Sequence, residues 1–219
     1  MESKNVLVIG ASGGFGSLFV TGLAAQGHQV LAAARNTERI PQGANLRLKL
    51  DLEDSASIKL LTDYLIDQGI QLNGIVQAAG AVGFGRAEET PSEGAHRLMQ
   101  INHLGPAQLI SSLLPILADE SFIVGINGIV SEKIFPGMSA YSASKTANSA
   151  YLQTLAMELR RKKIQVLDAK PGHTETGLAT RAIFGTAPAF PQGMTAEHVV
   201  NTIMTALSEG KTALTSSDF

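Results

Sequence analysis

The chain has 219 residues, of which 44% are hydrophobic and 16% charged, a balance typical of a folded globular domain rather than a disordered segment. A formal net charge of -2 disfavours nucleic-acid binding, and the lack of cysteine excludes disulfides, zinc–thiolate sites and thiol nucleophiles. The five histidines show no spacing typical of a metal site, so we expect no metal. The first apolar run, which ends at Gly10, is too short for a signal sequence or a membrane span, so we expect a cytoplasmic protein without a membrane partner.

Short apolar runs alternate with longer amphipathic segments along the chain. In chain order, we predict a strand at Val6–Ile9, a helix at Phe15–Gln26, strands at Gln29–Ala34 and Leu46–Leu50, a helix at Ile58–Gln68, a strand at Gly74–Ala78, and a helical region from about Glu93 to Leu117 that is interrupted at Gly105-Pro106. We then predict a strand at Phe122–Ile126, a helix at Ala140–Lys163, a strand at Ile164–Ala169, a helix at Ala196–Glu209, and a candidate edge strand at Thr212–Thr215.

Continuous apolar strands of this kind are typical of parallel strands that are buried on both faces. Their alternation with helices predicts one α/β domain over residues 1–219, because no linker or repeat divides the chain. We therefore expect a single-domain Rossmann fold with a doubly wound, mostly parallel sheet of six or seven strands and helices on both faces.

The first strand leads directly into a glycine-rich turn that is followed by a helix. Glycines in such a turn allow a sharp bend and let backbone N–H groups approach a pyrophosphate, which the positive end of the helix dipole also attracts. Glycines also serve in plain turns, but the position between the first strand and first helix of a long alternating pattern favours a dinucleotide site. The predicted cofactor-binding residues of this turn are Gly10, Ser12, Gly13, Gly14, Phe15 and Gly16.

The end of the second strand indicates which dinucleotide binds. An acidic residue there would accept hydrogen bonds from the ribose hydroxyls of NAD, whereas this strand ends in Ala32-Ala33-Ala34-Arg35. A guanidinium suits the 2′-phosphate of NADP through bidentate, charge-assisted hydrogen bonds. The sequence therefore predicts NADP(H) rather than NAD(H); the alternative is that Arg35 is a solvated arginine in a turn.

Six short motifs follow one another along nearly the whole chain. They are GASGGFG from Gly10, Asp51-Leu52, Gln77-Ala78-Ala79-Gly80, INHLG with Asn102, Tyr141-Ser142-Ala143-Ser144-Lys145, and Pro171-Gly172 with Thr176. Their order and spacing resemble those of the short-chain dehydrogenase/reductase family, in its compact, single-domain branch. One such motif would be a weak signal, whereas six in register are a strong one.

The resemblance implies how the matched positions would bind the dinucleotide. Asp51 would hydrogen-bond the adenine amino group with Leu52 beside the ring, and the adenine ribose would be lined by Ala79 and Gly80. The nicotinamide end would be bound by Pro171, Gly172, the backbone of His173, which would meet the carboxamide, and Thr176 in support.

The resemblance also implies three catalytic residues: Tyr141 as the acid/base, Lys145 as a ligand of the nicotinamide ribose, and Asn102 as a holder of a proton-relay water. The spacing of the first two agrees with this, because residues four apart lie on one face of a helix. An ammonium close to a phenol stabilises the phenolate, so we expect the pKa of Tyr141 to be lowered. Taken alone, the motif would equally suit an ordinary exposed pair on a helix.

One position departs from the family pattern. An ungapped alignment places Gly128 where the family usually has the serine whose hydroxyl holds the substrate carbonyl oxygen. Losing one such donor typically costs about a hundred- to a thousandfold in rate. Asn127 or Ser131 could take its place through a local bulge, a substrate hydroxyl or water could serve instead, or the protein is a poor reductase or none.

The functional hypothesis favoured by these residues is NADPH-dependent reduction of a small carbonyl compound, or the reverse oxidation of an alcohol. A non-catalytic NADP(H)-binding sensor or partner subunit is the first alternative, and a Tyr141-dependent isomerase or dehydratase without net redox is the second. The segments Ala81–Glu88 and 173–194 are rich in small and apolar side chains, so we expect an apolar substrate and, at 173–194, a substrate flap. By resemblance, a homodimer or homotetramer is expected.

Overall fold

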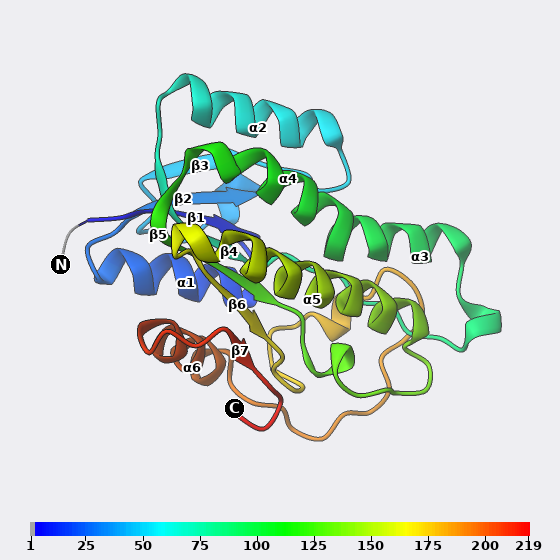
Figure 1. The fold of residues 1–219 in the computed structure, drawn as a ribbon. Helices are drawn as coiled ribbons and strands as arrows, with labels where there is room; N and C mark the ends of the chain where they lie inside the picture. Colours follow the sequence, from blue (N-terminus) through cyan, green and yellow to red (C-terminus); the bar gives the residue numbers. More distant parts are fainter. Residues whose placement is uncertain (1–2) are drawn as a thin grey trace.

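The computed structural model describes residues 3–219, which form one seven-stranded, all-parallel sheet of order β3-β2-β1-β4-β5-β6-β7 with helices on both faces (Figure 1). This confirms the predicted Rossmann-like fold. The strands are β1 (Asn5–Ile9), β2 (Gln29–Ala34), β3 (Leu46–Lys49), β4 (Leu72–Gln77), β5 (Leu117–Ile126), β6 (Gln165–Ala169) and β7 (Ala213–Leu214). The helices are α1 (Gly14–Ala25), α2 (Ser55–Asp67), α3 (Ser92–Met99), α4 (Gly105–Leu113), α5 (Ser139–Leu159) and α6 (Ala196–Ser208).

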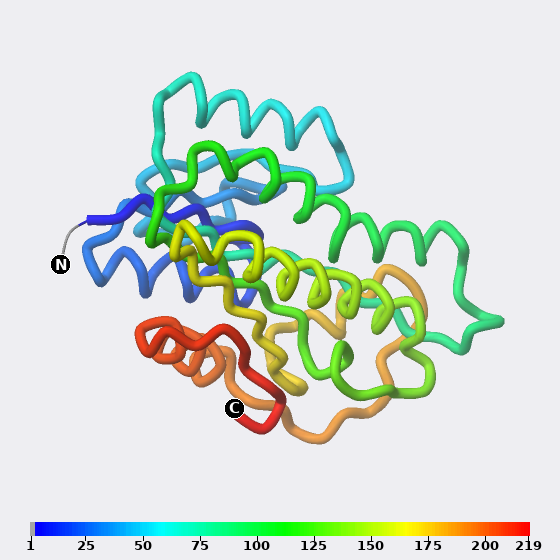
Figure 2. The backbone as a smooth tube through the Cα atoms, viewed as in Figure 1, coloured from blue at the N-terminus to red at the C-terminus, as the bar shows by residue number. Residues whose placement is uncertain are grey.

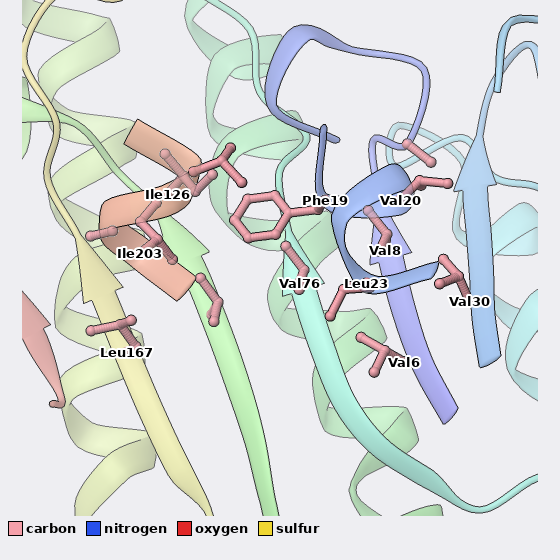
Figure 3. Close-up of a cluster of buried hydrophobic side chains, with 14 of the residues drawn as sticks. Val6, Val8, Phe19, Val20, Leu23, Val30, Val76, Ile126, Leu167 and Ile203 are labelled. Carbon is pink, nitrogen blue, oxygen red and sulfur yellow. The ribbon is translucent and has the colours of Figure 1, made fainter. Parts of the chain in front are cut away.

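Two apolar layers hold the helices on the sheet. Under α1 and α6, Phe19 of α1 packs with Val8 and Val76 of the sheet and with Ile203 of α6 (Figure 3). The opposite layer lies under α2, α4 and α5, and its members are mostly buried leucines, isoleucines and valines of these helices and of the strands. Because successive side chains of a strand point to opposite faces, the continuous apolar strands fill both layers.

Two predicted boundaries in the central part of the chain are wrong. The helical region breaks not at Gly105-Pro106 but in the preceding π-helical turn η3 (Gln100–Leu104), and α4 begins at Gly105 with a proline in its first turn, where the missing N–H costs nothing. The helical region ends close to its predicted limit, because the 3-10 turn η4 (Leu114–Ile116) follows α4, but β5 begins at Leu117, where it pairs with Leu72, and not at the predicted Phe122.

The carboxyl ends of four neighbouring strands lie at the same edge of the sheet. Ile9 pairs with Gln77, Gln77 with Gly125, and Ile126 with Ala169, so the chain leaves β1, β4, β5 and β6 at matched heights. Figure 2 shows the segment 173–194, coloured gold to orange, returning along the same end of the molecule as the loop between β5 and α5. Ligands of open α/β sheets bind at this edge. No helix among residues 3–219 has both the length and the apolar character needed to cross a membrane.

Candidate active site

The glycine turn after β1 is shaped by contacts that a side chain would prevent. Gly10 has φ +82°, and a methyl group added to it would lie 2.6 Å from the backbone nitrogen of Ala79. A methyl group on Gly16 would lie 2.1 Å from the carbonyl oxygen of Gly10. Helix α1 starts at Gly14 with no side-chain cap and no acidic residue in its first turn, which leaves its positive end open to an anion. These features fit the pyrophosphate of a dinucleotide.

The predicted adenine end lies where β2 and β3 finish. Arg35 follows β2, its side chain is 69% exposed, and its Nη1 lies 3.9 Å from Oε2 of Glu53. Glu53 is held more tightly by Arg97 of α3, at 2.7 and 3.1 Å, and this hydrogen-bonded pair lowers the pKa of the Glu53 carboxyl. Asp51 Oδ1 accepts a hydrogen bond from the Glu53 backbone, and the adjacent Leu52 is buried. Sequence reasoning missed Glu53, although it directly follows the Asp51-Leu52 motif.

The structure brings Tyr141, Lys145 and Asn102 together near Gly80. Tyr141 and Lys145 are both buried on α5, and Lys145 Nζ donates to the Ile126 carbonyl at 2.9 Å. A methyl group on Gly80 would lie 3.2 Å from Lys145 Nζ and 3.4 Å from Asn102 Oδ1, so the glycine keeps space open beside the amine. A cofactor ribose is the group that the family resemblance implies for this space.

The protonation of this pair differs from the sequence expectation. Burial among apolar side chains raises the pKa of Tyr141 to about 12, so the predicted lowering by Lys145 does not occur in this structure. Burial lowers the pKa of Lys145 to about 8, and the negative charge of Asp168 partly opposes that effect. Desolvation is the main cause of both shifts, and at neutral pH the phenol is protonated and the amine mostly charged.

Asn102 lies in the π-helical turn η3, and its side chain is held by protein groups. Its Oδ1 accepts from the Ala81 backbone at 2.8 Å, while its Nδ2 donates to the Ala81 carbonyl and to Ser144 Oγ, both at 2.9 Å. The side chain therefore joins the loop after β4 to α5. Its predicted part in holding a proton-relay water stays a prediction.

The turn after β5 shows why neither proposed replacement for the serine lies in place. Gly128 has φ +83° and ψ 164°, a backbone region that is almost restricted to glycine. Asn127 is 1% exposed, with Nδ2 donating to Asp168 Oδ1 at 2.6 Å and Oδ1 accepting from Asn148 at 2.8 Å. Ser131 Oγ donates to the Gly128 carbonyl at 2.8 Å. Both side chains are engaged elsewhere.

The predicted flap 173–194 covers Tyr141 with apolar groups. Ile183 N donates to the Val82 carbonyl at 2.9 Å, and Phe84 N donates to the Phe184 carbonyl at 3.1 Å. The Phe184 ring fits against two glycines, because a methyl group on Gly83 or Gly94 would lie 2.4 Å from it. The apolar side chains around Tyr141 include Ala81, Val82, Phe84, Leu98, Ile101, Val130, Leu178 and Ile183.

The nicotinamide-side residues predicted from the resemblance lie at the start of this segment and just before it. Pro171 accepts from the Ile129 backbone at 2.8 Å, and Gly172 accepts from a threonine hydroxyl two residues on. The His173 ring stacks on Phe190 with centroids 4.5 Å apart. Thr176 lies against the glycine turn, since a methyl group on Gly14 would be 2.8 Å from its Cβ. Their cofactor contacts stay predictions.

Comparison with known proteins identifies the family of the chain. The short chain dehydrogenase family model matches residues 4–183, so the chain belongs to the short-chain dehydrogenase/reductase family. A 3-ketodihydrosphingosine reductase of Bacteroides thetaiotaomicron is 29% identical over 180 residues, which cover 81% of this chain and 66% of that protein. The chain spans from 18% to 66% of the length of the first curated relatives it matches.

Two solved structures share the fold over nearly the whole chain. A short-chain dehydrogenase from Streptomyces avermitilis is 27% identical, with a TM-score of 0.86 over 99% of this chain and 90% of its own. A short-chain dehydrogenase from Sphingobium yanoikuyae, solved in complex with NADPH, is 23% identical with a TM-score of 0.86 over 97% and 87%. The second likeness bears on the fold alone.

Proposed function

We propose that this chain is an NADPH-dependent reductase of small, apolar aldehydes or ketones. The observation that carries the proposal is the pairing of a buried, protonated Tyr141 with a buried Lys145 on one face of α5, under an apolar cover. This pair lies at the edge of the sheet where the glycine turn opens the positive end of α1.

Reduction moves a hydride to the carbonyl carbon and a proton to the carbonyl oxygen. When bound, the dinucleotide supplies the hydride. Tyr141 donates the proton from Oη, and a pKa of about 12 keeps the phenol protonated at neutral pH, which suits the acid in the reducing direction. The charged form of Lys145 stabilises the phenolate that remains after transfer.

Arg35 supports the preference for NADPH over NADH. Its guanidinium is largely exposed and makes only a long contact with Glu53, which is itself bound to Arg97. It is therefore available to a 2′-phosphate without breaking a strong ion pair.

The substrate class follows from the cover over Tyr141. Alanine, valine, leucine, isoleucine and phenylalanine side chains surround the phenol, so a polar substituent next to the carbonyl would lose hydrogen bonds to water without replacement. The name of the Bacteroides relative, a ketone reductase, agrees with carbonyl reduction.

Gly128 favours a second candidate, a non-catalytic NADP(H)-binding protein. Neither Asn127 nor Ser131 supplies a donor in place of the expected serine. The Asn127 amide donates to Asp168, and the Ser131 hydroxyl donates to the Gly128 carbonyl. A protein of this kind would bind the cofactor and leave carbonyl compounds unchanged.

Nucleotide titrations combined with a turnover screen test both candidates. NADPH and NADH are titrated into wild type and Tyr141→Phe, and NADPH oxidation is followed with a panel of aldehydes, ketones and quinones. We expect wild-type turnover, a loss of about a hundredfold or more in Tyr141→Phe, and unchanged NADPH affinity, because only the proton donor is removed. Tight binding without turnover would support the non-catalytic candidate. Failure to bind either nucleotide would contradict both.

We further propose that the chain forms a homodimer or homotetramer through the outer faces of α4 and α5. Large apolar side chains stay exposed there: Leu104, just before α4, is 49% exposed, and Met157 of α5 is 72% exposed. Sedimentation equilibrium of wild type and of Met157→Glu tests this, and a monomeric wild type would contradict it.

A further inference from the structure

A buried carboxylate that the proposed reaction does not use lies directly behind the catalytic pair. Asp168, near the end of β6, is 1% exposed. Its Oδ1 accepts from Asn127 Nδ2 at 2.6 Å, and its Oδ2 accepts from Ser149 Oγ and from Gln153 Nε2 at 3.3 Å. Four donors, including Lys170 Nζ at 3.4 Å from Oδ2, suit an ionised carboxylate, which only accepts hydrogen bonds.

The fold places this carboxylate one residue pair away from the carbonyl that Lys145 binds. Asp168 pairs with Gly125 across β5 and β6, and the following pair, Ile126 and Ala169, includes the carbonyl that accepts from Lys145 Nζ. Ser149, which donates to Asp168, is one helical turn after Lys145 on α5. Within a buried site, a compensating charge has a large effect on an ammonium.

The same carboxylate fixes the turn that departs from the family. Asn127 is held through its side chain by Asp168, and its backbone N–H donates to the Ala169 carbonyl at 2.8 Å. Gly128, the next residue, donates to the same carbonyl at 3.3 Å. A buried asparagine that bridges two strands in this way restricts the neighbouring backbone.

We propose that Asp168 is a positioning residue of the active site, which keeps Lys145 charged and holds the Asn127–Gly128 turn in place. The catalytic meaning of this role rests on the proposed reductase function, whereas the coupling between Asp168 and Lys145 does not.

The groups that face Asp168 come from several elements. Lys145, Ser149 and Gln153 lie on α5, Lys170 follows β6, and the neutral Asn127 follows β5. On the far side of Asn127 lie Asn148 and then His103 of η3, whose pKa is lowered chiefly by burial. The cations nearest to Asp168 are therefore Lys145 and Lys170, and Lys170 lies at the end of the network with 15% of its side chain exposed.

The test is a pH titration of the Lys145 side-chain nitrogen by NMR of protein labelled with ¹⁵N-lysine, with Lys145→Met to assign the signal. We expect a pKa of about 8 in wild type and roughly 7 in Asp168→Asn, because an amide keeps the shape but removes the charge. At pH 7.5 that change would reduce the charged fraction about threefold. Ser149→Ala is the matched control, because it removes one donor and keeps the carboxylate, so Lys145 should titrate as in wild type.

The pH profile of kcat/KM provides the catalytic measurement. The alkaline limb should move to lower pH in Asp168→Asn by the same interval as the Lys145 titration, and should stay in place in Ser149→Ala. An unchanged Lys145 titration in Asp168→Asn overturns the proposal, and so does a shifted titration with an unmoved profile. If wild type turns over no carbonyl compound but Lys145 responds as expected, the reductase function fails and the coupling stands.

If Asp168→Asn does not fold, thermal unfolding of the double variant Asp168→Asn/Lys145→Met tests whether Asp168 compensates the charge of Lys145. Removal of both charges should restore folding, because no uncompensated buried ammonium remains. The proposal is overturned if the double variant is also unfolded while the single variant Lys145→Met folds.

Discussion

Two glycines with almost the same positive φ angle illustrate two different uses of one residue type. Gly10 in the nucleotide turn has φ +82°, and Gly128 in the turn after β5 has φ +83°. At Gly10 a side chain is also excluded by space, since a methyl group would touch Ala79 at 2.6 Å. At Gly128 a methyl group would meet only the Pro171 carbonyl oxygen, at 3.6 Å, so conformation alone excludes a side chain.

The comparison separates cofactor binding from the chemical step. The nucleotide turn matches the family pattern, and backbone contacts that only glycine permits define its shape. The turn after β5 departs from the pattern, and hydrogen bonds from buried polar side chains fix its conformation. A serine at Gly128 would therefore require a different backbone, and the site depends on Tyr141 and Lys145 without it.

The largest expected effect tests the nucleotide turn. Gly16→Ala places a methyl group 2.1 Å from the Gly10 carbonyl oxygen, so the turn must move, and NADPH affinity should fall about a hundredfold, or about 2.7 kcal/mol. Gly22→Ala in the same helix is the control, because nothing lies within 4 Å of the added methyl group. It should bind NADPH normally and gain stability of up to about 1 kcal/mol. Equal NADPH affinity in both variants, measured by calorimetry, would contradict the assigned site.

An intermediate effect tests the turn after β5. Gly128→Ser should lower the free energy of unfolding by about 1–3 kcal/mol and leave kcat no higher, because the serine inherits a strained backbone. Gly172→Ser is the stability control at the same edge of the sheet, since its methylene would meet only Met194 Cε at 3.6 Å. Denaturant unfolding checks both variants. A stable Gly128→Ser with increased turnover would show that the turn readily adopts the usual family geometry.

The smallest expected effect tests the preference for NADPH over NADH. Arg35→Ala should weaken NADPH binding about tenfold and leave NADH binding unchanged, because one largely exposed arginine supplies the charge for the 2′-phosphate. Arg39→Ala, an exposed arginine four residues on, should change neither affinity. Equal loss for both nucleotides in Arg35→Ala would assign the arginine to the stability of the turn.

Much of the fold and of the nucleotide turn could be predicted from sequence. Continuous apolar strands alternating with helices predicted a doubly wound, mostly parallel sheet, and the position of the glycines between β1 and α1 located the turn. The π-helical turn around Asn102 could not be predicted, because its side-chain bonds to Ala81 and Ser144 join segments far apart in the chain.

The sequence contains one indication of the buried hydrogen-bond network around Asp168. Asp168 is a charged residue inside a mostly apolar strand, which is unusual unless the charge has partners. Its partners Asn127 and Ser149 lie 41 and 19 residues away, so their contact required the structure. The raised pKa of Tyr141 was missed for the same reason, since the residues that bury it come from the segment around Ile183 and from the loop after β4.

The most direct test of the central claim is a transfer experiment with NADPH that carries deuterium at both C4 positions of the dihydronicotinamide. The wild-type protein is incubated with the labelled cofactor and an apolar aldehyde or ketone, and the product is analysed by mass spectrometry beside that of Tyr141→Phe. We predict that wild type forms an alcohol carrying one deuterium on the former carbonyl carbon, and that the variant forms almost none. Bound NADPH without labelled alcohol from any carbonyl compound would contradict the proposed reductase.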